Sequence, residues 1–345
     1  MNRGKTMKNV TFINTVLLLT SLTVISLSFG KNTPVDSKIA KATVKQVGQL
    51  MTDNYVFPDM GVRAANELNK YLESGGFAQF KDSKRMAKAL TKALRKTTKD
   101  KHLSVRVRQA GGKHHSAKDM ENKKHKDREH QRQRNQGIAQ VSRLADNIGY
   151  LDLRGFVSFN EGKNAIDASM ALLTSADVII IDLRKNGGGD PEMVQYLSSF
   201  FFQERLLLNS LYYRPGDVTE EYWTLKRVNG TKLPNIPLYI LTSHYTFSAA
   251  EEFSYNMQTR KRATLVGETT GGGANPGSMF IINDHFEMFL STGRAINPIT
   301  KTNWEGVGVV PEIAVDAELA LEKAIELATV SAGKVRDKAR ITTSD

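Results

Sequence analysis

Two continuous apolar runs, each followed by a turn and a helical pattern, constrain the fold of this chain most strongly. The runs lie at residues 178–181 and 237–241. Runs without polar alternation are typical of strands buried on both faces, which occur in parallel sheets covered by helices. The remaining pattern predicts strands at 148–153 and 263–266, and helices at 164–174, 191–202 and 248–257. The sequence therefore predicts an α/β core with a substantially parallel sheet.

Residues 35–98 show helical periodicity instead. Val44 and Val47 fall on one helical face, and Met86 and Leu90 recur at a spacing of four. We expect this part to form a small helical domain. The domains that we expect are a signal segment at 1–30, a helical N-terminal domain at 31–99, a core at 100–317, and a C-terminal helix and tail at 318–345.

The first 30 residues resemble a secretory signal peptide. Three basic residues precede an apolar run at 10–29, which ends at the small residues Ser28 and Gly30. We expect cleavage before Lys31 and export, to the periplasm or beyond the cell. The alternative is an uncleaved membrane anchor, since the run approaches spanning length. The chain has no cysteine, which excludes disulfides, thiol catalysis and thiolate metal sites.

The net charge of +12 is concentrated in one internal segment. Residues 101–135 hold eleven Lys and Arg against four Asp and Glu. The segment at 113–134 is almost free of apolar residues, so we expect a solvated basic loop at 111–136. Weak contact with an anionic envelope surface is the alternative, while the lack of aromatics argues against nucleic-acid binding. Its four histidines show no fixed metal-ligand geometry, and we expect no metal.

Three consecutive glycines, Gly187, Gly188 and Gly189, follow the apolar run that ends at residue 181. Such a turn is costly in backbone entropy, which indicates that something there needs bare backbone. Its amides can donate to an oxyanion. The alternative is a tight turn without a ligand. A phosphate loop is disfavoured because no Gly-Lys-Ser/Thr ending is present.

Ser248 lies between the apolar run at 237–241 and a helical pattern. A serine at this position can cap the helix. Alternatively, it can act as a nucleophile whose developing oxyanion is met by the next amide, that of Ala249, and by the helix dipole. The position alone leaves both interpretations open.

In their order along the chain, these segments resemble the tail-specific (C-terminal processing) serine proteases. The shared pattern is Asp-Leu-Arg-x-Asn-x-Gly-Gly after a strand, here at 182–189, then a second strand and Ser-Ala-x-Glu, here at 248–251. The segment at 262–272 is similar to the continuation, and the resemblance covers about 98–317. It implies a crotonase/ClpP-like spiral core behind a helical N-terminal domain. It also implies a serine peptidase that acts on peptides or proteins without a cofactor.

Two departures identify a branch of this family. Gly273 occupies the place of the lysine in the Ser-Lys dyad of many members, and the segment between 102 and 148 is too short and polar for their PDZ insert. The tricorn-type and interphotoreceptor retinoid-binding protein-like members instead use a histidine and a glutamate. The matching residues are His102 and Glu305, which implies a triad with Ser248. His244 and His285 are rival bases.

The resemblance also implies an oxyanion hole formed by Ala249 with Gly187 or Gly188. Two functions of other classes stay open at this point. Retinoid-binding relatives use the fold without catalysis, so the chain could be a carrier of a hydrophobic ligand. An envelope-anchoring protein that uses its basic segment would need no catalytic site.

Overall fold

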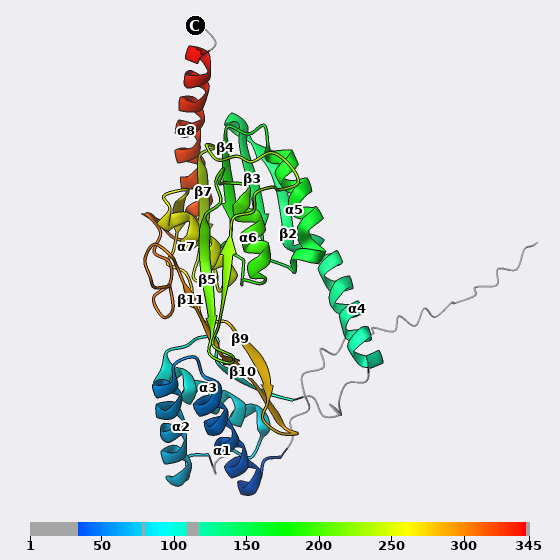
Figure 1. The fold of residues 1–345 in the computed structure, drawn as a ribbon, viewed down its shortest axis with the longest axis vertical. Coiled ribbons are helices and arrows are strands. Elements are labelled where there is room, and N and C mark those ends of the chain that lie inside the picture. The colour runs from blue at the N-terminus through cyan, green and yellow to red at the C-terminus, as the bar shows by residue number, and fades with distance from the viewer. Residues whose placement is uncertain (1–33, 78–79, 109–116, 343–345) are drawn as a thin grey trace, which may run out of the picture.

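The computed structural model describes residues 34–77, 80–108 and 117–342. The expected signal segment therefore lies outside the described residues. A helical bundle stands at one end of the molecule and an α/β unit at the other, with long strands between them (Figure 1). No helix within the described ranges is both long and apolar enough to cross a bilayer.

The N-terminal bundle consists of α1 (Ser37–Asn54), α2 (Pro58–Glu73) and α3 (Ser83–Thr98). Asp36 and Asp82 cap α1 and α3 with their side chains, each accepting a hydrogen bond from a backbone amide three residues later. The apolar positions that recur in the sequence, among them Val44, Met86 and Leu90, are fully buried in one small core. The predicted helical N-terminal region is confirmed.

The core is built on a six-stranded sheet in the order β12-β8-β7-β4-β3-β2. All neighbouring strands in it are parallel except β2 and β3, which are antiparallel. The strands are β2 (Ile138–Leu144), β3 (Ile148–Leu153), β4 (Val178–Asp182), β7 (Leu238–Thr242), β8 (Thr264–Gly267) and β12 (Ile313–Ala314). Every strand predicted from an apolar run is therefore present to within one residue.

Helices cover both faces of this sheet. One face packs against α5 (Phe159–Leu173), α6 (Pro191–Ser199) and α7 (Ala249–Thr259). The other face packs against α8 (Ala320–Thr342), through the buried alanines Ala320, Ala324, Ala328 and Ala332. This alanine stripe lets α8 approach the strands closely. The predicted α/β core is thus confirmed.

Two three-stranded sheets connect the core with the bundle. Their orders are β1-β10-β9 and β11-β5-β6. The strands are β1 (Ser104–Val107), β5 (Leu207–Tyr213), β6 (Val218–Trp223), β9 (Gly277–Ile281), β10 (Phe286–Ser291) and β11 (Gly293–Ile296). Arg214 fixes the connection, because its guanidinium donates to the Tyr55 carbonyl of the bundle at 2.8 Å. The polar, largely exposed β6 carries no apolar run, so the sequence did not predict it.

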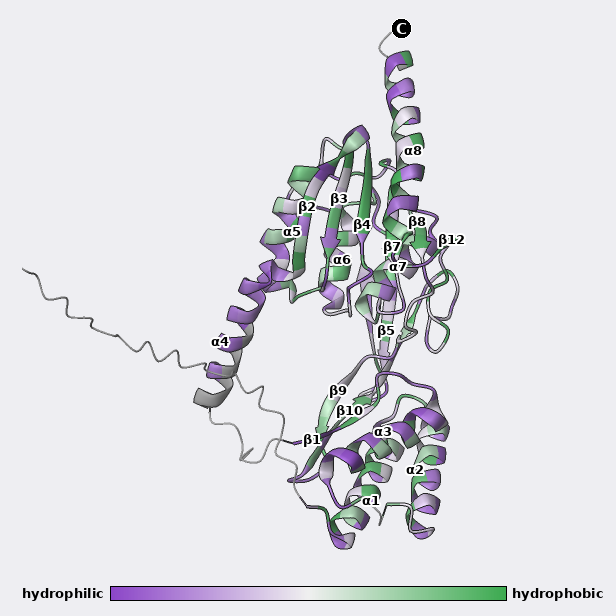
Figure 2. Cartoon of the chain, turned by 180° about the vertical axis from the view of Figure 1, so that it is seen from behind, coloured by the Kyte–Doolittle hydropathy of each residue, from purple (hydrophilic) through white to green (hydrophobic). Residues whose placement is uncertain are grey.

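The basic segment contains a helix, α4 (Ala117–Gln133), and the loop expected at 111–136 is wrong for these residues. Lys, Arg, Glu and Gln are good helix formers, and pairs such as Arg132 with Glu129 add support one turn apart. Figure 2 shows α4 as hydrophilic, in contrast to the hydrophobic β4. Its described side chains are mostly exposed, as the composition predicts.

Candidate active site

Ser248 directly precedes α7, at the turn that follows β7. Its backbone has φ 54° and ψ −121°, a region that residues other than glycine rarely adopt. Its amide donates to the Glu251 carboxylate at 2.8 Å, which helps to hold this conformation. Backbone strain of this kind persists only where surrounding contacts enforce it, and it clusters at functional sites.

The glycine turn lies against Ser248. A Cβ added at Gly188, where φ is +105°, would lie 2.8 Å from the Ser248 Cβ, so only glycine fits. The Gly188 amide donates to Asn186 Oδ1 at 2.9 Å. By contrast, the amides of Gly187 and Ala249 donate to no acceptor in the described part of the chain. Both residues line the same cavity as Ser248.

His102 lies between α3 and β1, and its amide donates to Asp100 Oδ1 at 2.9 Å. Its ring packs between Phe247 and Phe289, with ring centroids 4.7 and 5.9 Å away. Burial lowers the pKa of His102, with Asp100 acting in the opposite direction. The neutral imidazole, the form that a general base requires, is therefore favoured.

The space beside Gly273 explains why this chain lacks a lysine there. A Cβ at Gly273 would collide with the Phe247 ring and would lie 2.7 Å from His102 Cε1. The histidine ring thus fills the volume into which a side chain at position 273 would extend. A lysine at Gly273 and the observed position of His102 exclude each other.

Glu305 lies behind His102. Its Oε2 accepts hydrogen bonds from the amides of Ala274 and Asn275, at 2.6 and 3.1 Å. Its Oε1 is buried and has no partner in the described part of the chain, and the same holds for Nδ1 of His102. The nearest ligating atoms of His102, Glu305 and Asp100 all lie within 4.8 Å of one another. The side chains of His102 and Glu305 thus lie in one buried cluster, and each has a polar atom without a partner among the described residues.

Asp100 is a fully buried member of this cluster that the sequence reasoning missed. Its Oδ2 accepts from Tyr55 Oη and Asn275 Nδ2, both at 3.2 Å. Burial raises the pKa of the Tyr55 hydroxyl, which keeps it a donor. By distance, Asp100, His102 and Glu305 could hold a metal ion. However, protein donors already occupy both oxygens of Asp100 and one of Glu305, which fits a hydrogen-bonded cluster better.

Glu251 is the second residue that was missed, and it is also fully buried. Its carboxylate accepts hydrogen bonds from the amides of Ser248, Gly272 and Gly273 at 2.6–2.9 Å, and from the Thr270 hydroxyl at 2.5 Å. Burial raises its pKa, and these donors counteract the effect. The available signal was the Ser-Ala-x-Glu segment, whose glutamate is also the usual partner in a helix capping box.

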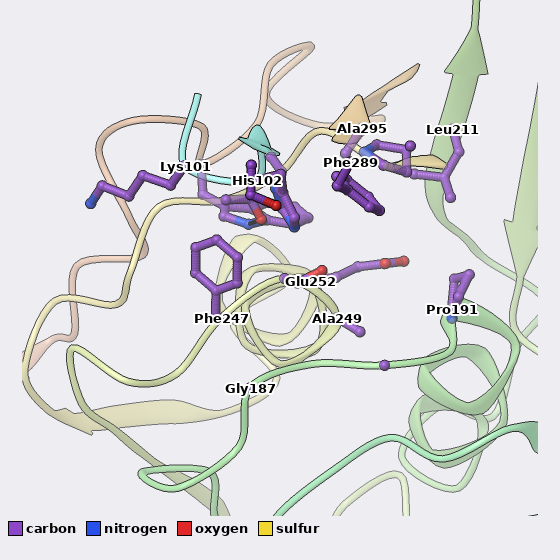
Figure 3. Close-up of a pocket in the computed structure, with 18 of the residues that line it drawn as sticks. Lys101, His102, Gly187, Pro191, Leu211, Phe247, Ala249, Glu252, Phe289 and Ala295 are labelled. Atoms are coloured by element: carbon purple, nitrogen blue, oxygen red, sulfur yellow. Dashed lines mark hydrogen bonds between the residues drawn. The ribbon is translucent and has the colours of Figure 1, made fainter. Parts of the chain in front are cut away.

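Ser248, His102, Gly187 and Ala249 line one cavity of about 630 Å³. Figure 3 shows His102 beside Phe247 on one side and Ala249 below it. The rival bases lie elsewhere. His244 is exposed and contacts the Thr269 carbonyl, and the half-buried His285 lies at the β9–β10 turn.

The raised pKa of Glu305 predicts a pH-dependent stability. Burial, together with the charge of Asp100, raises this pKa to about 7. The fold therefore favours the protonated form, and the resulting stabilisation is complete below about pH 4.5 and is lost as the pH rises through 7. Between pH 5 and 8, the free energy of unfolding should fall by on the order of 1–3 kcal/mol more in the wild type than in Glu305→Gln.

Urea denaturation at four pH values measures this difference. The lowered pKa of His102 acts on both proteins and largely cancels in the comparison. Glu67→Gln, at an exposed ion pair with Lys70, is the control and should parallel the wild type. A difference between the wild type and Glu305→Gln that stays constant with pH would contradict the prediction.

Comparisons with known proteins agree with this architecture. Residues 147–315 match Peptidase family S41, and residues 36–142 match the N-terminal domain of Peptidase_S41 in eukaryotic IRBP. A carboxyl-terminal-processing protease of Synechocystis sp. is 30% identical over 179 residues, which are 52% of this chain and 40% of that protein. The chain thus spans well under two thirds of the curated relatives that it matches.

Two solved structures share the fold. A protein of Parabacteroides merdae, described as a peptidase, has a TM-score of 0.60 and 21% identity, covering 84% of this chain and 96% of that one. A lipoprotein of Streptococcus agalactiae has a TM-score of 0.52 and 16% identity, covering 86% and 97%. The two family matches adjoin and together span most of the chain. The chain belongs to peptidase family S41.

Proposed function

We propose that the protein is a serine peptidase that cleaves peptide or protein substrates through an acyl-enzyme at Ser248. The observation that carries the proposal is that a serine in a strained backbone conformation and a buried imidazole line one cavity. A buried carboxylate, that of Glu305, lies in one cluster with this imidazole, and each of the two has a buried polar atom without a partner among the described residues. Family membership supports the same activity.

In the proposed mechanism, Ser248 Oγ attacks the carbonyl carbon of the substrate, and His102 Nε2 accepts the hydroxyl proton. His102 Nδ1–H then donates to Glu305 Oε1, which stabilises the imidazolium. The tetrahedral intermediate collapses as the C–N bond breaks and His102 returns the proton to the leaving amine. Water, activated by the same histidine, hydrolyses the ester and regenerates Ser248.

The oxyanion of the intermediate needs two donors. We propose the amide of Ala249, at the first turn of α7, and that of Gly187, because neither donates to an acceptor among residues 34–77, 80–108 and 117–342. The Gly188 amide would first have to leave Asn186 Oδ1. The N-terminal end of α7 adds a favourable dipole at the same place.

A fluorophosphonate probe tests this function directly. Activated serines react covalently with such probes, so we expect stoichiometric labelling of the wild type at Ser248, located by mass spectrometry of the labelled peptide. Ser248→Ala should not be labelled. Lack of labelling in the folded wild-type protein, or unchanged labelling of Ser248→Ala, would contradict the proposal and favour a carrier of hydrophobic ligands on the same fold.

We further propose that the protein is exported, to the periplasm or beyond the cell. The proposal rests on the signal-like pattern of residues 1–30. The basic segment that contains α4 is free to contact anionic envelope surfaces weakly, since its described side chains are mostly exposed.

A further inference from the structure

The cavity beside Ser248 has two chemically different ends. At one end lies His102, next to Lys101 and within electrostatic reach of Arg95. Glu252 extends toward the other end. Figure 3 shows the side chains of His102 and Glu252 in different parts of the cavity, with Glu252 on the side of Leu211. A substrate therefore meets positive charge near the proposed base and an acidic group at the opposite end.

Glu252 follows Ser248 by one turn of α7, so both lie on the same face of the helix. The residue is only 5% exposed, yet it lines the cavity between Ala249 and Pro191. Within the described ranges no cation pairs with its carboxyl group, and the side chain of Asn209 acts on it as a hydrogen-bond donor. A buried carboxyl group without a counter-charge is costly to ionise, which requires a reason for its presence.

The groups around Glu252 make its environment acidic and leave it without a counter-charge. Burial raises the pKa of Glu252 to about 7, a hydrogen bond from the Asn209 side chain opposes this effect, and the charge of Asp190 adds to it. Burial and Glu220 raise the pKa values of the Tyr213 and Tyr222 hydroxyls, and the charge of Glu252 makes a smaller contribution in the same direction. The groups that surround Glu252 are thus acidic or neutral.

Asn209 is a second buried polar group beside Glu252. This residue of β5 is fully buried and acts on the Glu252 carboxyl group as a hydrogen-bond donor, while its Oδ1 finds no donor among the described residues. Buried amides are normally paired, because an unpaired polar group costs about 1–3 kcal/mol. An acceptor without a donor, beside a carboxyl group without a counter-charge, is suited to a cationic donor.

We propose that Glu252 and Asn209 form a specificity subsite for a basic side chain, Lys or Arg, of the substrate residue that supplies the scissile carbonyl. The inference rests on the proposed function. The ammonium or guanidinium group would donate to the Glu252 carboxylate and to Asn209 Oδ1, and its aliphatic stem would lie against Leu211 and Tyr213. The opposite end repels a basic side chain through Lys101, which fixes the orientation of the substrate.

Paired fluorogenic peptides that differ only in lysine or norleucine before the scissile bond test the subsite. At pH 8 we expect the wild type to prefer the lysine peptide by about 10- to 100-fold in kcat/KM, as for a site built to hydrogen-bond its ligand. In Glu252→Gln the ratio should fall to about 1–3. Glu192→Gln removes an exposed carboxylate next to Pro191 and should keep the wild-type ratio.

The preference should also depend on pH. Glu252 ionises as the pH rises through about 7, so the lysine-to-norleucine ratio should increase from pH 6 to pH 8. Titration of His102 affects both peptides alike and cancels in the ratio. A wild-type ratio near 1 at pH 8, with norleucine cleaved as well as lysine, would overturn the proposal.

Binding to Ser248→Ala separates failure of the subsite from failure of the proposed function. Calorimetry should find the lysine peptide bound about tenfold more tightly than the norleucine peptide, and equal affinities in Ser248→Ala combined with Glu252→Gln. If Ser248→Ala binds the lysine peptide more tightly but the wild type cleaves neither peptide, the peptidase function is contradicted and the subsite is supported. Equal affinities for Ser248→Ala would refute the subsite, even if fluorophosphonate labels the wild type.

Discussion

Replacing His102 with alanine is expected to lower kcat/KM for peptide cleavage by a factor on the order of 10⁴ or more. A neutral serine hydroxyl is a weak nucleophile, and His102 is the imidazole that lines the same cavity as Ser248. Ser248→Ala should cause a similar loss. The double variant should be little worse than either single variant, because members of a triad act as a unit. Initial rates with a fluorogenic peptide give all three values.

The matched control is His244→Ala, which removes the rival histidine nearest in sequence. Its ring is exposed and contacts the Thr269 carbonyl, so its loss should leave the rate within about twofold. Lys261→Ala and Lys301→Ala, which test whether a lysine serves as the base, should also leave the rate within about twofold. Activity that survives His102→Ala but is lost with either lysine would refute the triad. Thermal unfolding shows whether His102→Ala, which empties the space between Phe247 and Phe289, still folds.

Replacing Glu251 with alanine is expected to produce the largest loss of stability at the site. Four donors, the amides of Ser248, Gly272 and Gly273 and the Thr270 hydroxyl, would lose their acceptor in a buried place. Removing one partner of such a buried charged network costs on the order of 3–5 kcal/mol. Urea denaturation at pH 7 measures this cost.

A positioning role predicts more than destabilisation. In the fraction of Glu251→Ala that stays folded, fluorophosphonate should label Ser248 at least about 100-fold more slowly, because the strained turn is no longer held. Glu251→Gln keeps the shape of the side chain but places an amide NH2 group against groups that are themselves donors. Its loss of labelling rate should therefore lie between those of the wild type and Glu251→Ala. Glu67→Ala, at an exposed ion pair, should change stability by less than about 0.5 kcal/mol. A loss below 1 kcal/mol in Glu251→Ala would contradict the role given to this residue.

Local patterns in the sequence determined the main elements. Residues 178–181 and 237–241 are apolar throughout. The fold buries the first run completely, and it buries Leu238, Ile240 and Leu241 of the second in the centre of the sheet. The repeat of Met86, Leu90 and Leu94 likewise predicted the buried face of α3. These predictions succeeded because the spacing of apolar residues along a short segment indicates whether a helix or strand is buried on one face or on both. The basic segment failed because good helix formers and solvated loop residues have overlapping compositions.

Short motifs that are far apart in the sequence also indicated the candidate site residues. They indicated a triad of Ser248, His102 and Glu305, which remains a proposal. The sequence showed that Gly273 stands where many relatives have a lysine. It did not show that the His102 ring fills the space beside Gly273. The two residues come together only when β1 pairs with β10 and the loop at 271–275 folds over α7.

Tertiary structure alone decided which buried polar groups have partners. Glu251 and Glu252 are adjacent in the sequence, yet Glu251 accepts four hydrogen bonds, whereas Glu252 lines the cavity and has no counter-charge among the described residues. In the sequence, Asp100 likewise has no feature that distinguishes it from other polar residues at a helix end, yet it is fully buried. The physical reason is that hydrogen-bonding partners and desolvation depend on groups contributed by distant segments, which no local pattern encodes.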